Sequence, residues 1–259
     1  MSLPPVLFHI FPRPLPYSNT WLLQERIHQL QLALRRSSAH PDVLLILQHR
    51  PTYTSGRRQT EPSIADERRR LQNLGADFIP ATRGGQLTYH GPGQIVGYPL
   101  VDLSRYRPTM GARDYVCRLQ NMLKGYLKEE HGITPAPSEH TGVFLDDVTK
   151  IASIGVQVRH RLTSHGFAIN ISQEPLSWFN KIVACGLDDV KAGSIQSHLQ
   201  KPVSYPTEAE LLVRYFGKAL QRDMVQLDVA KEGEIGQSIS ELEDVAASAG
   251  SWLIEPRSD

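Results

Sequence analysis

Hydrophobic residues follow two spacings along this chain, and each spacing predicts a different kind of element. Short apolar runs predict buried β-strands at residues 6–11, 43–47, 78–81, 95–103 and 167–171. Helical patterns, ended or started by glycine and capping residues, span residues 18–36, 63–74, 111–131 and 207–222. Two further apolar runs, residues 141–145 and 150–158, flank an Asp-Asp turn and predict a hairpin.

The starts of two helices are predicted from capping residues. Ser18 or Asn19 can cap the first helix, because a short polar side chain accepts a hydrogen bond from a free backbone N–H of the first turn. The run Thr207-Glu208-Ala209-Glu210 matches a capping box and predicts the start of the last helix.

The order of these elements indicates the fold class. Strands mostly follow strands, so an α+β fold with mixed or antiparallel sheets packed against helices is favoured over a doubly wound parallel sheet. The chain has 259 residues, which suits one large domain, predicted over residues 1–227. Residues 228–259 hold eight acidic and two basic residues, and we expect them to form a mobile or loosely packed acidic tail.

Charge and composition exclude several classes of protein. Lysine and arginine number 28 and the acids 27, a net charge of +1, so nucleic-acid binding through bulk charge is not expected. The longest purely apolar run, residues 43–47, is far shorter than the roughly 20 residues of a membrane span. Without the acidic tail the rest of the chain carries about +7, which suits an acidic protein partner.

The metal-ligating residue types lack metal-site spacing. Two cysteines cannot build a disulfide framework or a four-cysteine zinc site, and no His-Glu-x-x-His run is present, so we expect no metal. Two lone cysteines suit a reducing compartment. Prolines at positions 4, 5, 12, 14 and 16 interrupt any secretory signal, and one acid against four arginines in residues 1–40 is a weak transit-peptide pattern.

A glycine-rich stretch at residues 83–94 is the clearest candidate for a ligand site. It holds four glycines in twelve residues, which permits sharp turns and close approach of a ligand. It matches neither the phosphate loop nor the dinucleotide fingerprint. Glycine content alone fits a tight turn between strands equally well, but Arg83, Thr88, Tyr89 and His90 among the glycines favour a ligand site.

Two cysteines and one lysine are candidates for chemistry. Cys117 lies within a helical pattern, which predicts a buried core thiol. Cys185 has small neighbours that leave its sulfur approachable, although packing alone could explain it. Lys150 shares a strand face with apolar residues, so it either extends from the strand end or is held in a site. Since only about a few per cent of an ordinary thiol is ionised at pH 7, a reactive cysteine needs a partner.

The run RGGQLTYHGPGQIVGY at residues 83–98 closely resembles the signature of the lipoyl(octanoyl) transferases, which belong to the biotin/lipoate ligase fold superfamily. The resemblance extends in order through residues 51–57, 150–155, 164–170 and 184–187, and covers about residues 6–216. Ala184 departs from the family pattern, in which most members have proline before the cysteine.

The resemblance implies a fold like the biotin/lipoate protein ligase catalytic domain and assigns roles to residues. Cys185 would be the nucleophile and Lys150 its partner. The acyl group would be bound by residues of three matching segments: Arg83, Gly84, Gly85, Gln86, Leu87, Thr88, Tyr89 and His90; Ser153, Ile154 and Gly155; His165, Gly166, Phe167 and Ala168.

The implied activity is transfer of an octanoyl group from octanoyl-acyl carrier protein to a lysine of a lipoyl domain through a cysteine thioester, the first step of endogenous lipoate synthesis. The implied acceptors are the lipoyl domains of 2-oxo acid dehydrogenases and the glycine cleavage H protein. No cofactor or metal is expected, because the step from thioester to amide is downhill. Residues 141–147 and 178–183 look closer to eukaryotic members, so the location is mitochondrial if the source is eukaryotic and cytoplasmic if it is bacterial.

Three other functions stay open. An ATP-dependent lipoate or biotin-type ligase would not need Cys185, and the Gly-Arg-Gly-Arg loop expected of biotin ligases is absent. A non-catalytic binder of acyl carrier protein or lipoyl domains would not need Cys185 or Lys150. A Cys–His hydrolase could use Cys185 with His90 or His165, but no acid is placed to orient the histidine.

Overall fold

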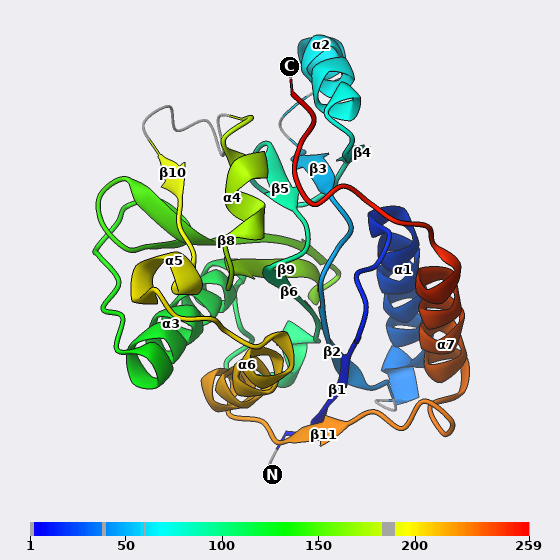
Figure 1. The fold of residues 1–259 in the computed structure, drawn as a ribbon. Coiled ribbons are helices and arrows are strands. Elements are labelled where there is room, and N and C mark those ends of the chain that lie inside the picture. The colour runs from blue at the N-terminus through cyan, green and yellow to red at the C-terminus, as the bar shows by residue number, and fades with distance from the viewer. Residues whose placement is uncertain (1–2, 38–39, 58, 60, 183–189, 259) are drawn as a thin grey trace.

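A mixed β-sheet forms the centre of the computed structural model, which describes residues 3–37, 40–57, 59, 61–182 and 190–258 (Figure 1). Seven strands follow one another across it in the order β10 (Lys191–Ala192), β8 (Thr149–Arg159), β9 (Leu162–Asn170), β6 (Gln94–Leu100), β2 (Asp42–Leu47), β1 (Val6–Ile10) and β11 (Met224–Gln226). The strand β7 (Val143–Phe144) pairs with β8 beside this path. The pairs from β8 to β2 are antiparallel, and the outer pairs β10–β8, β2–β1 and β1–β11 are parallel.

Helices cover both faces of this sheet, and strand β2 shows why. Leu44 and Ile46 point into one core, shared with α3 (Ala112–His131) and α6 (Tyr205–Leu220). Val43, Leu45 and Leu47 point into the other core, shared with α1 (Tyr17–Leu34) and α7 (Gly233–Ser248). Successive strand residues face opposite sides, so a continuous apolar run is buried on both faces.

A second, smaller sheet lies beside the first and carries the glycine-rich stretch. Its order is β4 (Asp77–Pro80), β3 (Thr52–Ser55) and β5 (Thr88–His90). The helices α2 (Glu61–Asn73) and α4 (Glu174–Phe179) pack on it, against β4 and β5 respectively. The short helix α5 (Ile195–Leu199) follows β10, and two single-turn 3₁₀ segments span Arg35–Ser37 and Leu103–Arg105.

The expected α+β class with mixed sheets is confirmed, but both predicted helix caps are wrong. The first helix starts at Tyr17 with Pro16 before it, and the last predicted helix starts at Tyr205 after Ser204. Pro206 lies in the first turn of α6, where proline needs no N–H partner and has a fixed helical φ, so this helix starts before the predicted capping box. The capping-box residues therefore lie within α6. In α1 the extended Pro16 takes the cap position, so Ser18 and Asn19 lie within the helix.

The prediction that Cys117 is buried is also wrong, because its side chain is exposed on α3. Tyr115 and Leu119, two positions away on each side, are buried. Residues two apart on a helix face roughly opposite directions, so these two cannot share the core face with Cys117.

The C-terminal residues, expected to form a mobile tail, include a helix that the composition did not indicate. Ile235, Ile239, Leu242 and Ala246 of α7 are buried against α1 in one core. Their spacing of three or four residues is helical, but the many acids on the exposed face dominate the composition. The division at residue 227 into a catalytic domain and a mobile tail stays a prediction. Across the described ranges, no helix is both long and apolar enough to span a bilayer.

Candidate active site

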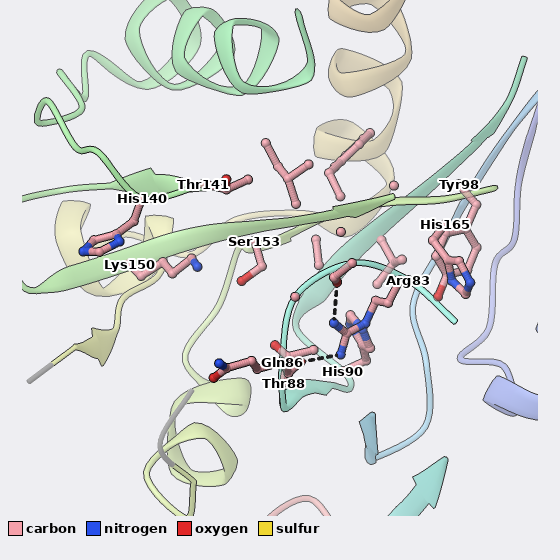
Figure 2. A pocket seen from close by; sticks show the side chains of 18 of the residues that line it. Arg83, Gln86, Thr88, His90, Tyr98, His140, Thr141, Lys150, Ser153 and His165 are labelled. Atoms are coloured by element: carbon pink, nitrogen blue, oxygen red, sulfur yellow. Dashed lines mark hydrogen bonds between the residues drawn. The ribbon is translucent and has the colours of Figure 1, made fainter. Parts of the chain in front are cut away.

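A cavity of about 270 Å³ lies between the glycine-rich stretch and strands β6, β8 and β9. It is lined by most of the residues predicted to bind the ligand, together with the predicted lysine: Arg83, Gly84, Gly85, Gln86, Thr88, His90, Lys150, Ser153, Ile154, Gly155, His165, Gly166, Phe167 and Ala168. In Figure 2, Lys150 and His140 lie on one side of this cavity, Tyr98 and His165 on the other, and Ser153 between them.

Two predicted residues do not line the cavity, and five lining residues were not predicted. Leu87 and Tyr89 point into the core of the small sheet instead, because neighbouring strand residues alternate in direction. The unpredicted residues come from α1, β6 and the loop before β7: Tyr17, Val96, Tyr98, His140 and Thr141.

The glycine-rich stretch lies directly on β8. The amide N–H of Gly84 donates to the Val156 carbonyl at 3.1 Å. A side chain at Gly155 would start 3.0 Å from the Gly84 carbonyl oxygen and 3.1 Å from Cδ of Arg83. Glycine at 155 therefore permits the close approach of the two segments that form this wall of the cavity.

Arg83 holds the glycine-rich stretch in shape from within. Its Nη2 donates to the carbonyl and hydroxyl oxygens of Thr54, both at 2.7 Å, and to the Gln86 carbonyl at 2.9 Å. Its Nη1 donates to the Gly84 carbonyl at 3.0 Å. The guanidinium is buried, so its positive charge acts on neighbouring groups with little solvent screening.

Two of the histidines that line the cavity, His90 and His165, are neutral at physiological pH. Burial, with the Arg83 charge as the next cause, lowers the pKa of His90 to about 4. The same two causes, followed by His90 itself, lower the pKa of His165 to about 3. Neither side chain therefore adds positive charge to the cavity at pH 7.

A chain of hydrogen bonds fixes which nitrogen of His90 carries the proton. Asn170 donates through Nδ2 to the Gly193 carbonyl at 2.9 Å, which sets the orientation of its amide. Its Oδ1 then accepts from Nε2 of Gln94 at 2.9 Å, and Oε1 of Gln94 is left to accept from Nδ1 of His90 at 2.7 Å. The neutral His90 ring is thus protonated at Nδ1, and Nε2 is a hydrogen-bond acceptor.

The end of the cavity away from Lys150 is built by aromatic rings. His49 donates from Nδ1 to the Leu15 carbonyl at 3.2 Å, so its Nε2 accepts the Tyr98 hydroxyl at 2.7 Å. The Tyr17 ring stacks on His90 with 5.9 Å between ring centroids. These contacts place Tyr98 and Tyr17 at the cavity wall from β6 and α1.

Lys150 is buried at the opposite end, in the second position of β8. Its Nζ lies 5.4 Å from the centre of the Phe144 ring on β7. Gly142 has φ of +129°, and a side chain there would start 2.6 Å from Cε of Lys150. The Lys150 carbonyl accepts the Gly193 N–H at 2.9 Å, which joins β8 to β10.

Cys185 lies outside the described residues, but the chain on each side of it is placed. A second cavity of about 160 Å³ shares Lys150, Ser153 and Ala168 with the first. Ile182 and Val190, the described residues that border positions 183–189, both line it. The segment with Cys185 therefore leaves and rejoins the described chain beside a cavity that contains Lys150. Within the described residues, no group of three or more histidine, cysteine or acidic side chains could hold a metal ion.

Comparison with known proteins assigns this fold and cavity to a class. The model of the lipoyl protein ligase A/B catalytic domain matches residues 16–217. An octanoyltransferase of Desulforamulus reducens is 35% identical over 220 residues, which are 85% of this chain and 93% of the relative. A mitochondrial octanoyl-[acyl-carrier-protein]:protein N-octanoyltransferase of Danio rerio is 38% identical over 74% of this chain and 82% of its own. The chain therefore belongs to the lipoyl protein ligase A/B catalytic-domain family and, within it, to the octanoyltransferases, which are acyltransferases.

Solved structures agree on the fold. A bi-partite lipoate protein ligase of Thermoplasma acidophilum has a TM-score of 0.62, with 98% of this chain and 97% of that chain covered at 14% identity. Lipoate-protein ligase A bound with ATP has a TM-score of 0.63, with 98% and 99% covered at 16% identity. The biotin protein ligase of Aquifex aeolicus scores 0.50, with 83% and 70% covered at 12% identity. The expected resemblance to ligase catalytic domains is confirmed for the fold.

Proposed function

We propose that this protein transfers an octanoyl group from octanoyl-acyl carrier protein to a lysine of a lipoyl domain through a thioester on Cys185. The main support for the proposal is that two neighbouring cavities share Lys150. Ile182 and Val190, which precede and follow the segment with Cys185, line the second of these cavities. The Danio rerio relative is named for transfer from the same donor to protein.

The first half-reaction moves the acyl group to the enzyme. The Cys185 sulfur attacks the donor thioester carbonyl, a new carbon–sulfur bond forms, and the bond to the carrier sulfur breaks. Lys150 takes the Cys185 proton or, as an ammonium, stabilises the thiolate, and the departing carrier thiolate receives a proton. One thioester replaces another, so the step needs no external energy source.

The second half-reaction forms the amide. The acceptor amine attacks the Cys185 thioester and Lys150 accepts a proton from the nitrogen. The carbon–sulfur bond breaks, and the Cys185 thiolate that leaves takes this proton. A thioester is converted to an amide, which is downhill and requires no ATP or metal.

The first cavity suits an alkyl chain along most of its length. Val96, Ile154, Phe167 and Ala168 supply apolar wall, and His90 and His165 are uncharged at pH 7. Burying each methylene contributes about 0.8 kcal/mol, so an eight-carbon acyl chain gains most of its affinity here. Arg83 donates to four oxygens of the protein within the glycine-rich wall, and Lys150 lies at the opposite end, where we place the reacting carbonyl.

The proposed acceptors are the lipoyl domains of 2-oxo acid dehydrogenases and the glycine cleavage H protein. The charge of about +7 on residues 1–227 suits an acidic carrier protein. The location is mitochondrial for a eukaryotic source and cytoplasmic for a bacterial one, since the relatives include both kinds.

An ATP-dependent ligase is the second candidate, because lipoate-protein ligase A bound with ATP has the same fold. One assay distinguishes the octanoyltransferase from the ATP-dependent ligase. Purified protein is incubated with a lipoyl domain and either octanoyl-acyl carrier protein alone or octanoate with ATP and magnesium. We expect octanoylation of the domain only from the carrier donor. Octanoylation only from octanoate with ATP would assign the ligase, and binding without either reaction would assign a non-catalytic binder.

A further inference from the structure

Residues 250–257, here called the C-terminal strap, run from the end of α7 across the small sheet to a point beside α2 (Figure 1). Arg50, which precedes β3, holds the beginning of the strap. Its Nη2 donates to the carbonyls of Gly250 at 3.0 Å and Ser251 at 3.2 Å. Its guanidinium carbon lies 5.5 Å from the centre of the Trp252 ring. These contacts combine directed hydrogen bonds with a cation–π contact.

The other end of the strap is attached to the end of α2. The Arg257 amide donates to the Leu74 carbonyl at 3.0 Å. Leu253 packs directly over Gly75, where a side chain would start 2.3 Å from Cδ1 of Leu253. The strap is thus attached at both ends, which restricts the position of the residues between them.

The middle of the strap contacts helix α4. Nε1 of Trp178 donates to the Ile254 carbonyl at 3.0 Å. Trp178 is only 1% exposed, and its ring stacks on Tyr89 of β5 at 5.4 Å and an interplanar angle of 6°. Its carbonyl accepts the Tyr53 hydroxyl at 2.8 Å. Trp178 therefore joins the strap above it to the small sheet beneath it.

Helix α4 matters because it leads into the segment that carries Cys185. Phe179 packs edge-on against Tyr89 at 5.6 Å and lines the second cavity together with Lys150. Cys185 follows Phe179 by six positions in the sequence. Any rotation or shift of α4 moves Phe179 and Ile182, which line the second cavity, relative to Lys150.

We propose that the C-terminal strap is a positioning element for acyl transfer, which holds α4 through Trp178 and so sets where the Cys185 segment starts. The inference rests on the proposed function of Cys185. The strap lies beyond residues 16–217, so the family's catalytic domain does not include it. Trp178 and the strap act through α4 and are positioning groups rather than catalytic residues.

Truncation with a matched control tests this role. One chain ends at Ala249 and lacks the strap, and the control ends at Arg257 and keeps every contact described above. Because small displacements of reacting groups are costly, we expect kcat of the strapless chain to fall about tenfold or more, with KM for the octanoyl donor within about twofold. The control keeps both constants. A synthetic peptide of residues 248–259 restores activity to the strapless chain.

A lower melting temperature with an unchanged kcat would overturn the proposal, because it would show a purely structural role. Trp178→Phe removes the indole donor but keeps a stacked ring, and it tests the same contact if the strapless chain folds poorly. We expect a loss of kcat in the same direction, and wild-type kcat in this variant would also overturn the proposal.

Amide hydrogen exchange tests the effect of the strap on α4 independently of the proposed role of Cys185. We expect residues 174–182 to exchange faster in the strapless chain than in the control, whether or not either chain transfers octanoyl groups. Equal exchange in this segment would overturn the strap proposal while leaving the Cys185 mechanism untouched. Faster exchange in the strapless chain, together with a control chain that has no transferase activity, would instead count against the proposed function alone.

Discussion

Gly142 lies against the side chain of Lys150, so close that a methyl group at position 142 would start 2.6 Å from Cε and 3.2 Å from Nζ. The two residues come from the loop before β7 and from the start of β8, and Phe144 completes the enclosure of the ammonium group. The geometry of Lys150 is thus set by an adjacent glycine as well as by its own strand.

Gly142→Ala is expected to displace Lys150 and to lower the rate of transfer by about tenfold or more, because the reacting group loses its position. The substitution also strains a residue with φ of +129° and would place the new methyl group 2.6 Å from the Ala152 carbonyl oxygen. Gly132→Ala is the matched control: Gly132 ends α3 with φ of +66° and open space around it, so it carries only the backbone strain. Steady-state kinetics of folded samples checks the comparison. Equal kinetics in the two variants would show that the contact does not position Lys150.

The tautomer of His90 is a second prediction. We expect ¹⁵N NMR of the wild-type protein to show Nδ1 protonated and Nε2 unprotonated, as the chain from Gly193 through Asn170 and Gln94 requires. Gln94→Glu places a carboxylate on Nδ1 and is expected to raise the His90 pKa from about 4, because an opposite charge favours the imidazolium. Gln157→Glu on β8, outside the cavity lining, is the control for added charge. A proton on Nε2 in the wild type would refute the assignment.

The buried histidines predict how stability depends on pH. Burial and the Arg83 charge lower the His90 pKa to about 4, below the value near 6.5 expected in the unfolded chain. The unfolded state therefore binds more protons between these two pH values. The contribution of the neutral His90 ring to the free energy of unfolding is fully present above about pH 6.5 and decreases as the pH falls towards 4. For His90 alone the loss between pH 7 and pH 5 is about 2 kcal/mol.

Urea unfolding at pH 7 and pH 5 measures this loss. His165, whose pKa is lowered to about 3, adds to it in the same direction. His90→Asn should reduce the difference in unfolding free energy between the two pH values, because it removes one of the buried neutral rings. A wild-type difference near zero would mean that the ring is not buried in its neutral form.

Ile239→Ala distinguishes a packed α7 from a mobile tail. Ile239 is fully buried against α1, so its truncation should lower the free energy of unfolding by about 2–5 kcal/mol. Ala247→Ser, in the same helix but outside that core, is the control. If residues 228–259 were mobile in solution, both variants would unfold like the wild type in denaturant.

Local sequence patterns were sufficient for much of the cavity. Arg83, Thr88 and His90 of the glycine-rich stretch line one cavity, because glycine spacing and strand direction are short-range properties. Alternation along β5 and the residue before it would also have placed Leu87 and Tyr89 on the opposite side, in the core of the small sheet. The sequence-based interpretation treated the motif as one surface and so assigned both faces to the ligand.

Contacts between distant segments could not be predicted in this way. Tyr17 reaches the cavity from α1, and nothing near it in the sequence marks a ligand site. Tyr98 ends the signature run at residues 83–98, but its place on the cavity wall depends on how β6 packs in the sheet. Ile254 likewise meets Trp178 only because the chain returns to the small sheet after α7. Such relationships depend on topology, which local periodicity does not specify.

The most direct test of the account is the mass of the intact protein after incubation with octanoyl-acyl carrier protein and no ATP. The wild type and Cys117→Ser, which alters the exposed thiol of α3, are expected to gain one octanoyl group. Cys185→Ser is expected to gain none, and Lys150→Ala to gain it far more slowly or not at all. A hydroxylamine-labile adduct mapped to Cys185 would establish the acyl-enzyme. An adduct that persists in Cys185→Ser, or its absence from a folded wild type that still octanoylates a lipoyl domain, would contradict the mechanism.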